Sequence, residues 1–241
     1  MLLRLIHVLK ITQNGVSLCP MRASTRQFII GSFLTLLSCC ILLSSCKKNI
    51  TIREKIYVED AEDGIANAIS AVTGTGAQYG TMVRPFAGTN VIGNFNNTVV
   101  TIKLDNLPSH NMVYVAFDLY THDKWEGNRV GLPDIVDVWN LRVNEEFQLS
   151  TTFSNVRNQP QAYPEWIGST PNISRGNAID TLLPGNCLWE EKTNGSSKYR
   201  IAFSRPHTSS QLLVQMNDAL RGSFCEKSWS IDNILIEAIT N

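Results

Sequence analysis

The stretch Met112-Val-Tyr-Val-Ala-Phe-Asp-Leu-Tyr120 alternates apolar and mixed side chains with a period of two. In an extended strand, Val113, Val115, Phe117 and Leu119 would share one face, because successive side chains point to opposite sides. This alternation predicts a half-buried β-strand of an antiparallel sheet, with one face in a core and the other toward solvent.

The same period recurs along the chain after residue 56. Further strands are expected at 98–104, 139–143, 147–153, 198–203, 211–216 and 229–238, separated by clusters rich in Asn, Pro, Gly and Ser. In the strand at 147–153, Phe147, Leu149, Thr151 and Phe153 are expected on one side, and in the last strand Asp232, Ile234 and Ile236 are expected together. No stretch of a dozen residues keeps a helical period, so the pattern predicts a single all-β domain built as a β-sandwich.

Charge is distributed unevenly along the 241 residues. The chain has 21 basic and 21 acidic residues, but residues 1–45 hold four basic residues and no acidic one. From Cys46 onward, 17 basic residues therefore face 21 acidic ones. A nucleic-acid-binding domain would show a basic excess, so we exclude nucleic acid as a partner. The hydrophobic content of 43% is typical of a folded globular chain.

A secretory signal precedes the β-rich region. Arg22 and Arg26 form a positive segment after Met21, and an apolar run follows from Phe28 to Leu43. The run is short for a span of the bilayer, so a removed signal peptide is favoured over a transmembrane anchor. Met21 is a second candidate for the first residue.

The end of this signal, Leu43-Ser44-Ser45-Cys46, resembles the lipobox of bacterial (Bacteroidetes-type) lipoproteins. The resemblance implies cleavage before Cys46 and acylation of its thiol, for example with palmitate. We therefore expect a signal peptide at 1–45, a lipidated tether at 46–55 and the folded domain at 56–241. The chain would be anchored to the outer membrane of the cell envelope, either on the periplasmic side or at the surface.

Acidic residues cluster from the end of the strand at 112–120 into the segment that follows it. Asp118, Asp123 and Asp134 lie there with Glu126 and Asn128. Hard cations such as Ca²⁺ prefer six to eight oxygen ligands from carboxylates, amides and carbonyls. The spacing is not that of an EF-hand, and a solvated acidic loop is an equally good interpretation of the spacing alone.

Two short motifs near the chain ends carry a resemblance in fold. Glu62-Asp63-Gly64, together with the closing segment Trp229-Ser-Ile-Asp-Asn-Ile234, resembles the jelly-roll β-sandwiches of MAM domains and carbohydrate-binding modules. The resemblance implies an antiparallel jelly roll with a structural Ca²⁺ that joins the first strand to the last. Glu62 and Asp232 would be its first ligands, with Asp118, Asp123 and Asp134 as a second set.

Aromatic residues in expected loops are candidates for ligand contact. Trp125, Tyr163 and Trp166 lie among Asn, Gln and Asp side chains, a mixture that suits the apolar face and the hydroxyls of a sugar ring. Tryptophan in a sandwich also fills the core. The core interpretation is favoured for Trp139 and Trp229, which lie in expected strands.

Cys187 and Cys225 are the two cysteines that remain after Cys46. Outside the reducing cytosol they can form a disulfide, which would stabilise the fold by about 3–4 kcal/mol through the unfolded state. Two buried free thiols are an equally good interpretation, since sequence does not give their separation.

Motifs of enzymes are sparse. The chain has no GxSxG, HExxH or Walker A motif. We therefore expect a non-catalytic, lipid-anchored module that binds a glycan or an envelope protein. The alternatives are a glycan-cleaving enzyme that uses carboxylates near Asp123 and Glu126, and a structural component of an envelope complex.

Overall fold

The computed structural model describes residues 50–128 and 136–241, and within them every regular element is a strand. The twelve strands are β1 (Ile52–Glu59), β2 (Ile69–Thr73), β3 (Val83–Phe86), β4 (Thr89–Phe95), β5 (Thr98–Leu104), β6 (Met112–Asp123), β7 (Val138–Val143), β8 (Glu146–Thr152), β9 (Asp180–Leu183), β10 (Ser196–Pro206), β11 (Leu212–Ala219) and β12 (Lys227–Thr240). Among these residues there is no helix long and apolar enough to span a membrane.

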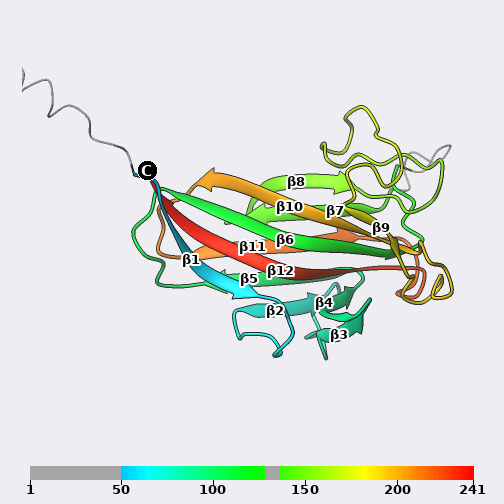
Figure 1. Cartoon of the computed structure of the whole chain (residues 1–241), viewed down its shortest axis with the longest axis horizontal. Coiled ribbons are helices and arrows are strands. Elements are labelled where there is room, and N and C mark those ends of the chain that lie inside the picture. Colours follow the sequence, from blue (N-terminus) through cyan, green and yellow to red (C-terminus); the bar gives the residue numbers. More distant parts are fainter. Residues whose placement is uncertain (1–49, 129–135) are drawn as a thin grey trace, which may run out of the picture. The chain divides into compact units, whose positions relative to one another are not determined.

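The strands form two antiparallel sheets (Figure 1). The first has the order β3-β4-β12-β6-β10-β9, with β1 also pairing with β12, and the second has the order β2-β5-β11-β7-β8. The long strand β12 pairs with β4 through its first half and with β1 through its second half. The all-β prediction is therefore confirmed.

The connectivity is that of a jelly roll. Four antiparallel pairs, β4 with β12, β5 with β11, β6 with β10 and β7 with β8, alternate between the two sheets. A chain folded back on itself in this way, then wrapped into two layers, produces the double Greek key of jelly-roll sandwiches. The expected jelly roll is confirmed.

The core lies between the sheets and follows the period of two. Val113, Val115, Phe117 and Leu119 of β6 are all fully buried. Trp139 and Trp229 are also fully buried, and their rings meet edge to face with centroids 6.1 Å apart. These large aromatic side chains contribute much of the apolar area that stabilises the domain.

The first part of the domain was only partly predicted. β1 begins at Ile52 and pairs with β12, so the last residues of the expected tether (46–55) belong to the sheet. Strands β1 to β4 and β9 were not predicted. Their alternation is weak because β1 is largely exposed and β4 is buried on both faces.

A β-bulge in β12 changes the side to which Asp232 points. Asp232 lies opposite Asp118 of β6, but Leu235 lies opposite Ala116, so β12 has one more residue than its partner here. Asn233, with φ of 50°, occupies the bulge. The prediction that Asp232 shares a side with Ile234 is therefore wrong: Ile234 is in the core cluster, and Asp232 is on the outer face of the first sheet.

Candidate functional site

Trp166 and Phe147 form an exposed aromatic platform. The side chain of Trp166 is 44% exposed and that of Phe147 is 48% exposed, and their rings meet edge to face at 6.4 Å. The guanidinium of Arg142 lies 4.0 Å from the centre of the Phe147 ring. A cation over an aromatic face is attracted by the ring and restricts its motion.

The platform depends on a second bulge, between β7 and β8. Leu141 pairs with Leu149, but Arg142 pairs with Phe147, so β8 has an extra residue. Residues 147 and 149, which a strict alternation would place together, therefore point to opposite faces. The prediction that Phe147 shares the face of Leu149 is wrong.

The segment that carries Trp166 is tied to the backbone of β8. The hydroxyl of Thr151 donates to the carbonyl of Glu165 at 2.7 Å, and the backbone N–H of Ile167 donates to the carbonyl of Ser150 at 2.8 Å. Trp166 lies between these two anchor points. The exposed ring of Trp166 is therefore carried by a loop that these hydrogen bonds hold in place.

Tyr163 lies in the same segment but is half-buried. Its ring packs against Phe153 and Tyr199, with centroids 4.8 and 5.2 Å away, and its hydroxyl donates to the carbonyl of Arg200. Burial raises the pKa of Tyr163. Tyr163 also lines a side groove of about 280 Å³, together with Gln148, Leu149, Arg200 and Phe203.

Trp125 does not belong to this surface. It is fully buried, its indole N–H donates to the carbonyl of Ser228 at 2.8 Å, and its ring packs edge to face against Phe153. The expectation of ligand contact at Trp125 is therefore wrong. The residue fills the core, because both the apolar ring and the N–H find partners inside the protein.

Two of the predicted metal ligands are neighbours on the outer face of the first sheet, and a third, Glu62, is near enough to raise the pKa of one of them, Asp232. Asp118 and Asp232 are opposite each other on β6 and β12. Glu62 accepts hydrogen bonds from the Thr89 hydroxyl at 2.5 Å and from the Asn90 backbone N–H at 2.9 Å. The structure thus places the acidic segment before β2 near the closing strand.

The surroundings of Asp232 and Glu62 shift their pKa values in opposite directions. Burial is the main cause that raises the pKa of Asp232, and the carboxylates of Asp118 and Glu62 add to the rise. The backbone N–H of Asn233 and the ammonium of Lys198 oppose it, and the resulting pKa is about 6. The hydrogen bond from Thr89 lowers the pKa of Glu62. The Asp232 carboxylate accepts hydrogen bonds from the backbone and side-chain N–H groups of Asn233 at 2.7 and 3.0 Å. Among the described residues it has no ion pair of its own, because Lys198 is paired with Asp118.

Asp118, in contrast, is paired with cations. Its carboxylate lies 2.8 Å from Lys198 Nζ and 3.0 Å from a guanidinium nitrogen of Arg200, and it also accepts from the side-chain amide of Asn233. Two cations already neutralise it. Asp118 is therefore a poor metal ligand, and this part of the expectation is corrected.

The pair Glu62 and Asp232 fits Ca²⁺ in part. In residues 50–128 and 136–241, no three His, Cys, Asp or Glu side chains are grouped as metal ligands. Two carboxylates supply only a fraction of the six to eight oxygens that Ca²⁺ takes, so backbone carbonyls, amides or water would complete the shell. A bound cation would favour the ionised form of Asp232 and so lower its raised pKa.

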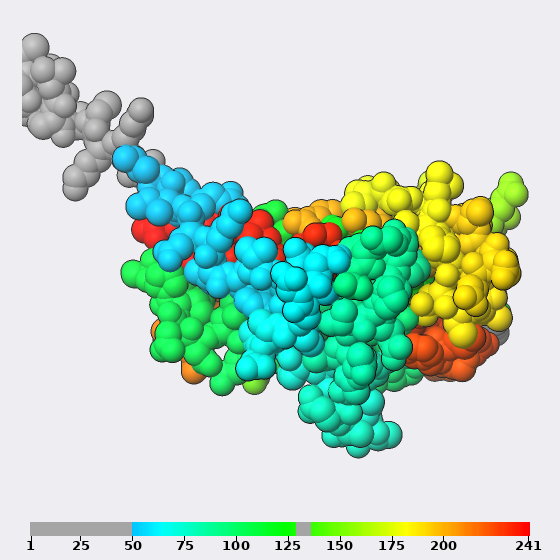
Figure 2. Space-filling view, turned by 60° about the horizontal axis from the view of Figure 1, so that its bottom comes forward, coloured from blue at the N-terminus to red at the C-terminus, as the bar shows by residue number. Residues whose placement is uncertain are grey.

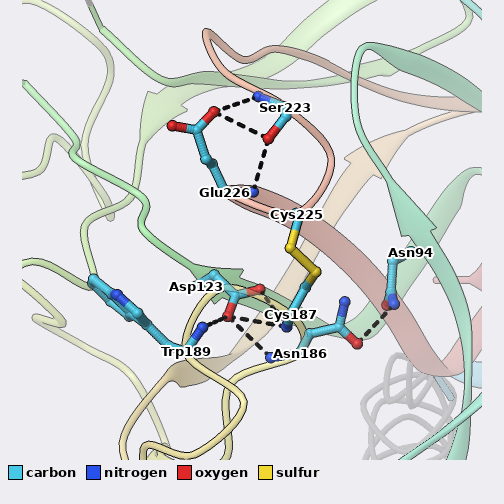
Figure 3. Close-up of a disulfide and its surroundings, with 8 residues drawn as sticks. All are labelled: Asn94, Asp123, Asn186, Cys187, Trp189, Ser223, Cys225 and Glu226. Carbon is cyan, nitrogen blue, oxygen red and sulfur yellow. Dashed lines mark hydrogen bonds between the residues drawn. A yellow bond between two sulfur atoms is a disulfide. The ribbon is translucent and has the colours of Figure 1, made fainter.

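Asp123 has a different role, which Figure 3 shows. It is fully buried and accepts the backbone N–H groups of Asn186, Cys187 and Trp189 at 2.9 to 3.3 Å. A Cβ at Gly185 would lie 2.1 Å from the Trp189 carbonyl oxygen, so only glycine lets the loop fold this closely around Asp123. The prediction of Asp123 as a metal ligand is wrong.

The loop held by Asp123 is also closed covalently. Cys187 and Cys225 are joined in a disulfide, with Cα atoms 5.0 Å apart (Figure 3). It connects the segment before β10 to the segment before β12. Cys46, the predicted lipid anchor, and Asp134, the remaining predicted ligand, lie outside the described residues.

The carboxylates that the enzyme alternative required are not available as an acid and base pair. Asp123 is saturated by backbone donors, as described above. The Glu126 carboxylate lies 3.2 Å from the ammonium of Lys227 and 3.7 Å from that of Lys124. A catalytic carboxylate needs to reach the substrate, and Asp123, being fully buried, does not.

Phe147 is the functional candidate that sequence reasoning missed. The signal for it was the hairpin turn Asn144-Glu145, in which both residues have positive φ. A two-residue turn of this kind fixes the pairing of the flanking residues, here Val143 with Glu146. Counting outward from that turn would have placed Phe147 beside Arg142.

Comparison with known proteins gives weak likenesses. No family model matches this sequence, and no curated protein matches it. Similar solved structures include latent PorU from Porphyromonas gingivalis, 13% identical with a TM-score of 0.42, where the match covers 82% of this chain and 14% of that chain. A family 35 carbohydrate binding module from Clostridium thermocellum is 10% identical with a TM-score of 0.33, and the match covers 75% and 95% of the two chains.

The K3 cleaved adhesin domain of Lys-gingipain from Porphyromonas gingivalis is also similar, with 11% identity, a TM-score of 0.35 and coverage of 77% and 100%. At identities this low and TM-scores below one half, these structures establish neither the family nor the function of this chain.

Proposed function

We propose that this protein is a lipid-anchored, non-catalytic module that binds glycans outside the cytoplasm, held to the outer membrane through Cys46. The aromatic platform of Trp166 and Phe147 carries the proposal. Two exposed, positioned aromatic rings offer flat apolar faces to the C–H face of a sugar. Exposed aromatic side chains on a folded domain commonly mark a binding surface.

The side groove supplies the polar complement. Gln148, Tyr163 and Arg200 line it, and the backbone bonds described above tie residues 165–167, and with them the platform, to β8. The amide of Gln148 and the hydroxyl oxygen of Tyr163 are suited to sugar hydroxyls, whereas the guanidinium of Arg200 is paired with Asp118. Because the loop is already held in place, little conformational entropy is lost on binding.

Trp166→Ala is expected to weaken glycan binding about tenfold or more, since exposed tryptophans that anchor a ligand each contribute more than about 1.4 kcal/mol. The measurement is a glycan array followed by titration of the best ligand, using the chain from Lys47 onward. Ile173→Ala is the matched control, because it removes an 80% exposed apolar side chain near the same segment. Equal binding by wild type and Trp166→Ala would reject the platform.

We further propose that Glu62 and Asp232 bind one structural Ca²⁺, which ties the start of the domain to its last strand. A cation between them would stabilise the ionised form of Asp232, whose pKa burial and neighbouring carboxylates raise to about 6. The ion would offer charge and orientation only. No catalytic step is attached to it.

Removal of Ca²⁺ by EGTA near pH 7 is expected to lower the melting temperature by about 5–10 °C, if free Ca²⁺ is about 100 times its Kd. Without metal, the folded-state pKa of Asp232 lies above its unfolded value. The stability of the fold therefore falls as pH rises from 3.8 to about 6 and Asp232 loses its proton. The difference in melting temperature between Ca²⁺-containing and Ca²⁺-free buffer should therefore be larger at pH 7 than at pH 5, where Asp232 is largely protonated.

Asp232→Asn should abolish the EGTA effect, while Asp63→Asn, at an exposed neighbouring acid, should retain it. Identical melting curves of wild type with and without EGTA near pH 7 would reject the calcium site.

A further inference from the structure

A hollow of about 350 Å³ lies away from the aromatic platform, between strands β3 and β4 and the disulfide loop. Its lining residues come from three separate parts of the chain: Arg84, Pro85, Asn94, Asn186, Cys187 and Phe224. In Figure 2 the teal β3–β4 segment lies against the yellow segment that precedes β10. We call this site the donor hollow.

Arg84 brings the only charged side chain to this lining. It projects from the edge strand β3, opposite Val91, and is exposed. Its guanidinium makes no hydrogen bond or ion pair with any part of the chain that the structure describes. An arginine without a partner has five N–H donors and a positive charge to offer, in a planar arrangement that matches a carboxylate.

Asn94 and Asn186 add further donors, because their oxygens are already used. The Asn94 Oδ1 accepts from the Ser230 hydroxyl at 2.6 Å, and the Asn186 Oδ1 accepts from the Asn94 Nδ2 at 2.9 Å (Figure 3). The side-chain amide of Asn186 thus keeps both of its N–H groups. Since each of the two amide oxygens already accepts one hydrogen bond, the groups left over in the donor hollow are mainly the N–H donors of Arg84 and Asn186.

The donors are held in place before any ligand arrives. Asn94 is 4% exposed, and the backbone N–H of Asn186 donates to buried Asp123 at 3.1 Å. The next residue, Cys187, is fixed by the disulfide to Cys225. A site that is already ordered loses little entropy when it binds.

Phe224 provides the apolar wall. Its side chain is 40% exposed and lines the donor hollow from the segment next to the disulfide. The hollow therefore combines one unpaired cation, several amide donors, no carboxylate and one aromatic face. That combination suits a ligand which is negatively charged at one end and has apolar C–H groups at the other.

We propose that the donor hollow binds the carboxylate of an acidic sugar, with Arg84 and the Asn186 amide on the carboxylate and Phe224 against the ring. The proposal rests on the proposed glycan-binding function for its class of ligand, but it concerns a second site. Charge-assisted and bidentate bonds from arginine to a carboxylate are among the stronger hydrogen bonds in proteins. Uncharged sugars would leave these donors without an anionic partner.

The test is an NMR titration of the ¹⁵N-labelled full chain in detergent with D-glucuronate, D-glucose and acetate. We expect glucuronate to bind with a Kd of about 1 mM, a value reasonable for a ligand of this size. The side-chain amide signals of Asn94 and Asn186 should shift. Glucose and acetate should each bind at least about tenfold more weakly, since each lacks one half of the recognised chemistry.

Arg84→Gln should weaken glucuronate binding about tenfold while the melting temperature stays unchanged, because the guanidinium has no partner to lose. Arg157→Gln, at an exposed arginine outside the hollow, is the matched control and should bind as wild type does. Undiminished binding by Arg84→Gln, equal affinity for glucose or acetate, or no binding up to about 50 mM would each overturn the proposal. Trp166-dependent glycan binding that persists in that event leaves the proposed function standing.

Discussion

Replacing Lys227 by methionine is expected to lower the free energy of unfolding by about 3–5 kcal/mol, the usual cost of leaving a buried charge unpaired. The Lys227 side chain is 3% exposed, and its ammonium lies 2.8 Å from a carboxylate oxygen of Asp137, which is also 3% exposed. It also contacts the carboxylate of Glu126 at 3.2 Å. Methionine keeps an unbranched apolar side chain, one atom shorter than lysine, and removes the charge together with the N–H donors to Asp137 and Glu126.

The cost arises mainly at Asp137. Burial raises the pKa of Asp137, and Lys227 opposes that rise. Without the ammonium, Asp137 must either stay charged in a buried site or take up a proton. The Asp137 carboxylate also accepts the backbone N–H of Glu126 at 2.7 Å, so it has a fixed position from which it does not escape to water.

Urea unfolding near pH 7 is the measurement. The double variant Lys227→Met/Asp137→Asn serves as the matched control and should recover part of the loss, because it no longer leaves a lone charge at this site. A loss of less than about 1 kcal/mol in the single variant, the range of a surface pair, would show that the ions are hydrated and that this account is incorrect.

Acid is expected to destabilise the domain through His122. The side chain is fully buried, and burial lowers its pKa to about 3. Its Nδ1 lies 3.1 Å from the Ser196 hydroxyl and its Nε2 lies 2.7 Å from the Ser230 hydroxyl, so the neutral ring has a partner at each nitrogen. Within residues 50–128 and 136–241, no carboxylate is hydrogen-bonded to the ring to stabilise a charged form.

The direction follows from proton binding. The unfolded chain takes up the proton with a pKa near 6.5, whereas the folded chain resists it down to about 3. The stability that His122 contributes is complete above pH 6.5 and is lost progressively as pH falls toward 3. The loss between pH 7.5 and pH 4.5 is about 3 kcal/mol.

Other groups titrate in the same pH range, so the contribution of His122 is measured as the difference between wild type and a variant without this histidine. Unfolding free energies of wild type and His122→Gln are compared near pH 7.5 and near pH 4.5. The variant is expected to lose about 3 kcal/mol less than wild type over this interval, because glutamine does not titrate. Parallel pH profiles of the two proteins would show that His122 is not neutral in the folded state.

Two of the errors in the sequence interpretation, those in the facing of strand residues, have one cause. Strict alternation predicted that Asp232 shares a side with Ile234 and Phe147 shares a side with Leu149. A bulge lies between the members of each pair, in β12 and in β8, and each bulge moves one side chain to the other face. An extra residue in one strand is defined only relative to its partner strand, so a single strand's pattern does not reveal it.

Other features depend on contacts between distant residues. Asp123 and its backbone donors are more than sixty positions apart, and Asn94 meets Asn186 across 92 positions. Among the aromatic candidates, Trp125 and Trp166 have similar sequence surroundings, yet one is fully buried and the other is 44% exposed. Burial of a loop residue depends on which segment covers it.

By itself, the amino-acid sequence determined the β class, the strands from β5 to β8 and from β10 to β12, and the excess of acidic over basic residues from Cys46 onward, because alternation and charge are local properties of a chain. Only the tertiary structure decided which carboxylates lie near one another, which aromatic rings reach the surface and which donors remain free. Those properties come from strand register and from long-range pairing, where a shift of one residue reverses the direction of a side chain.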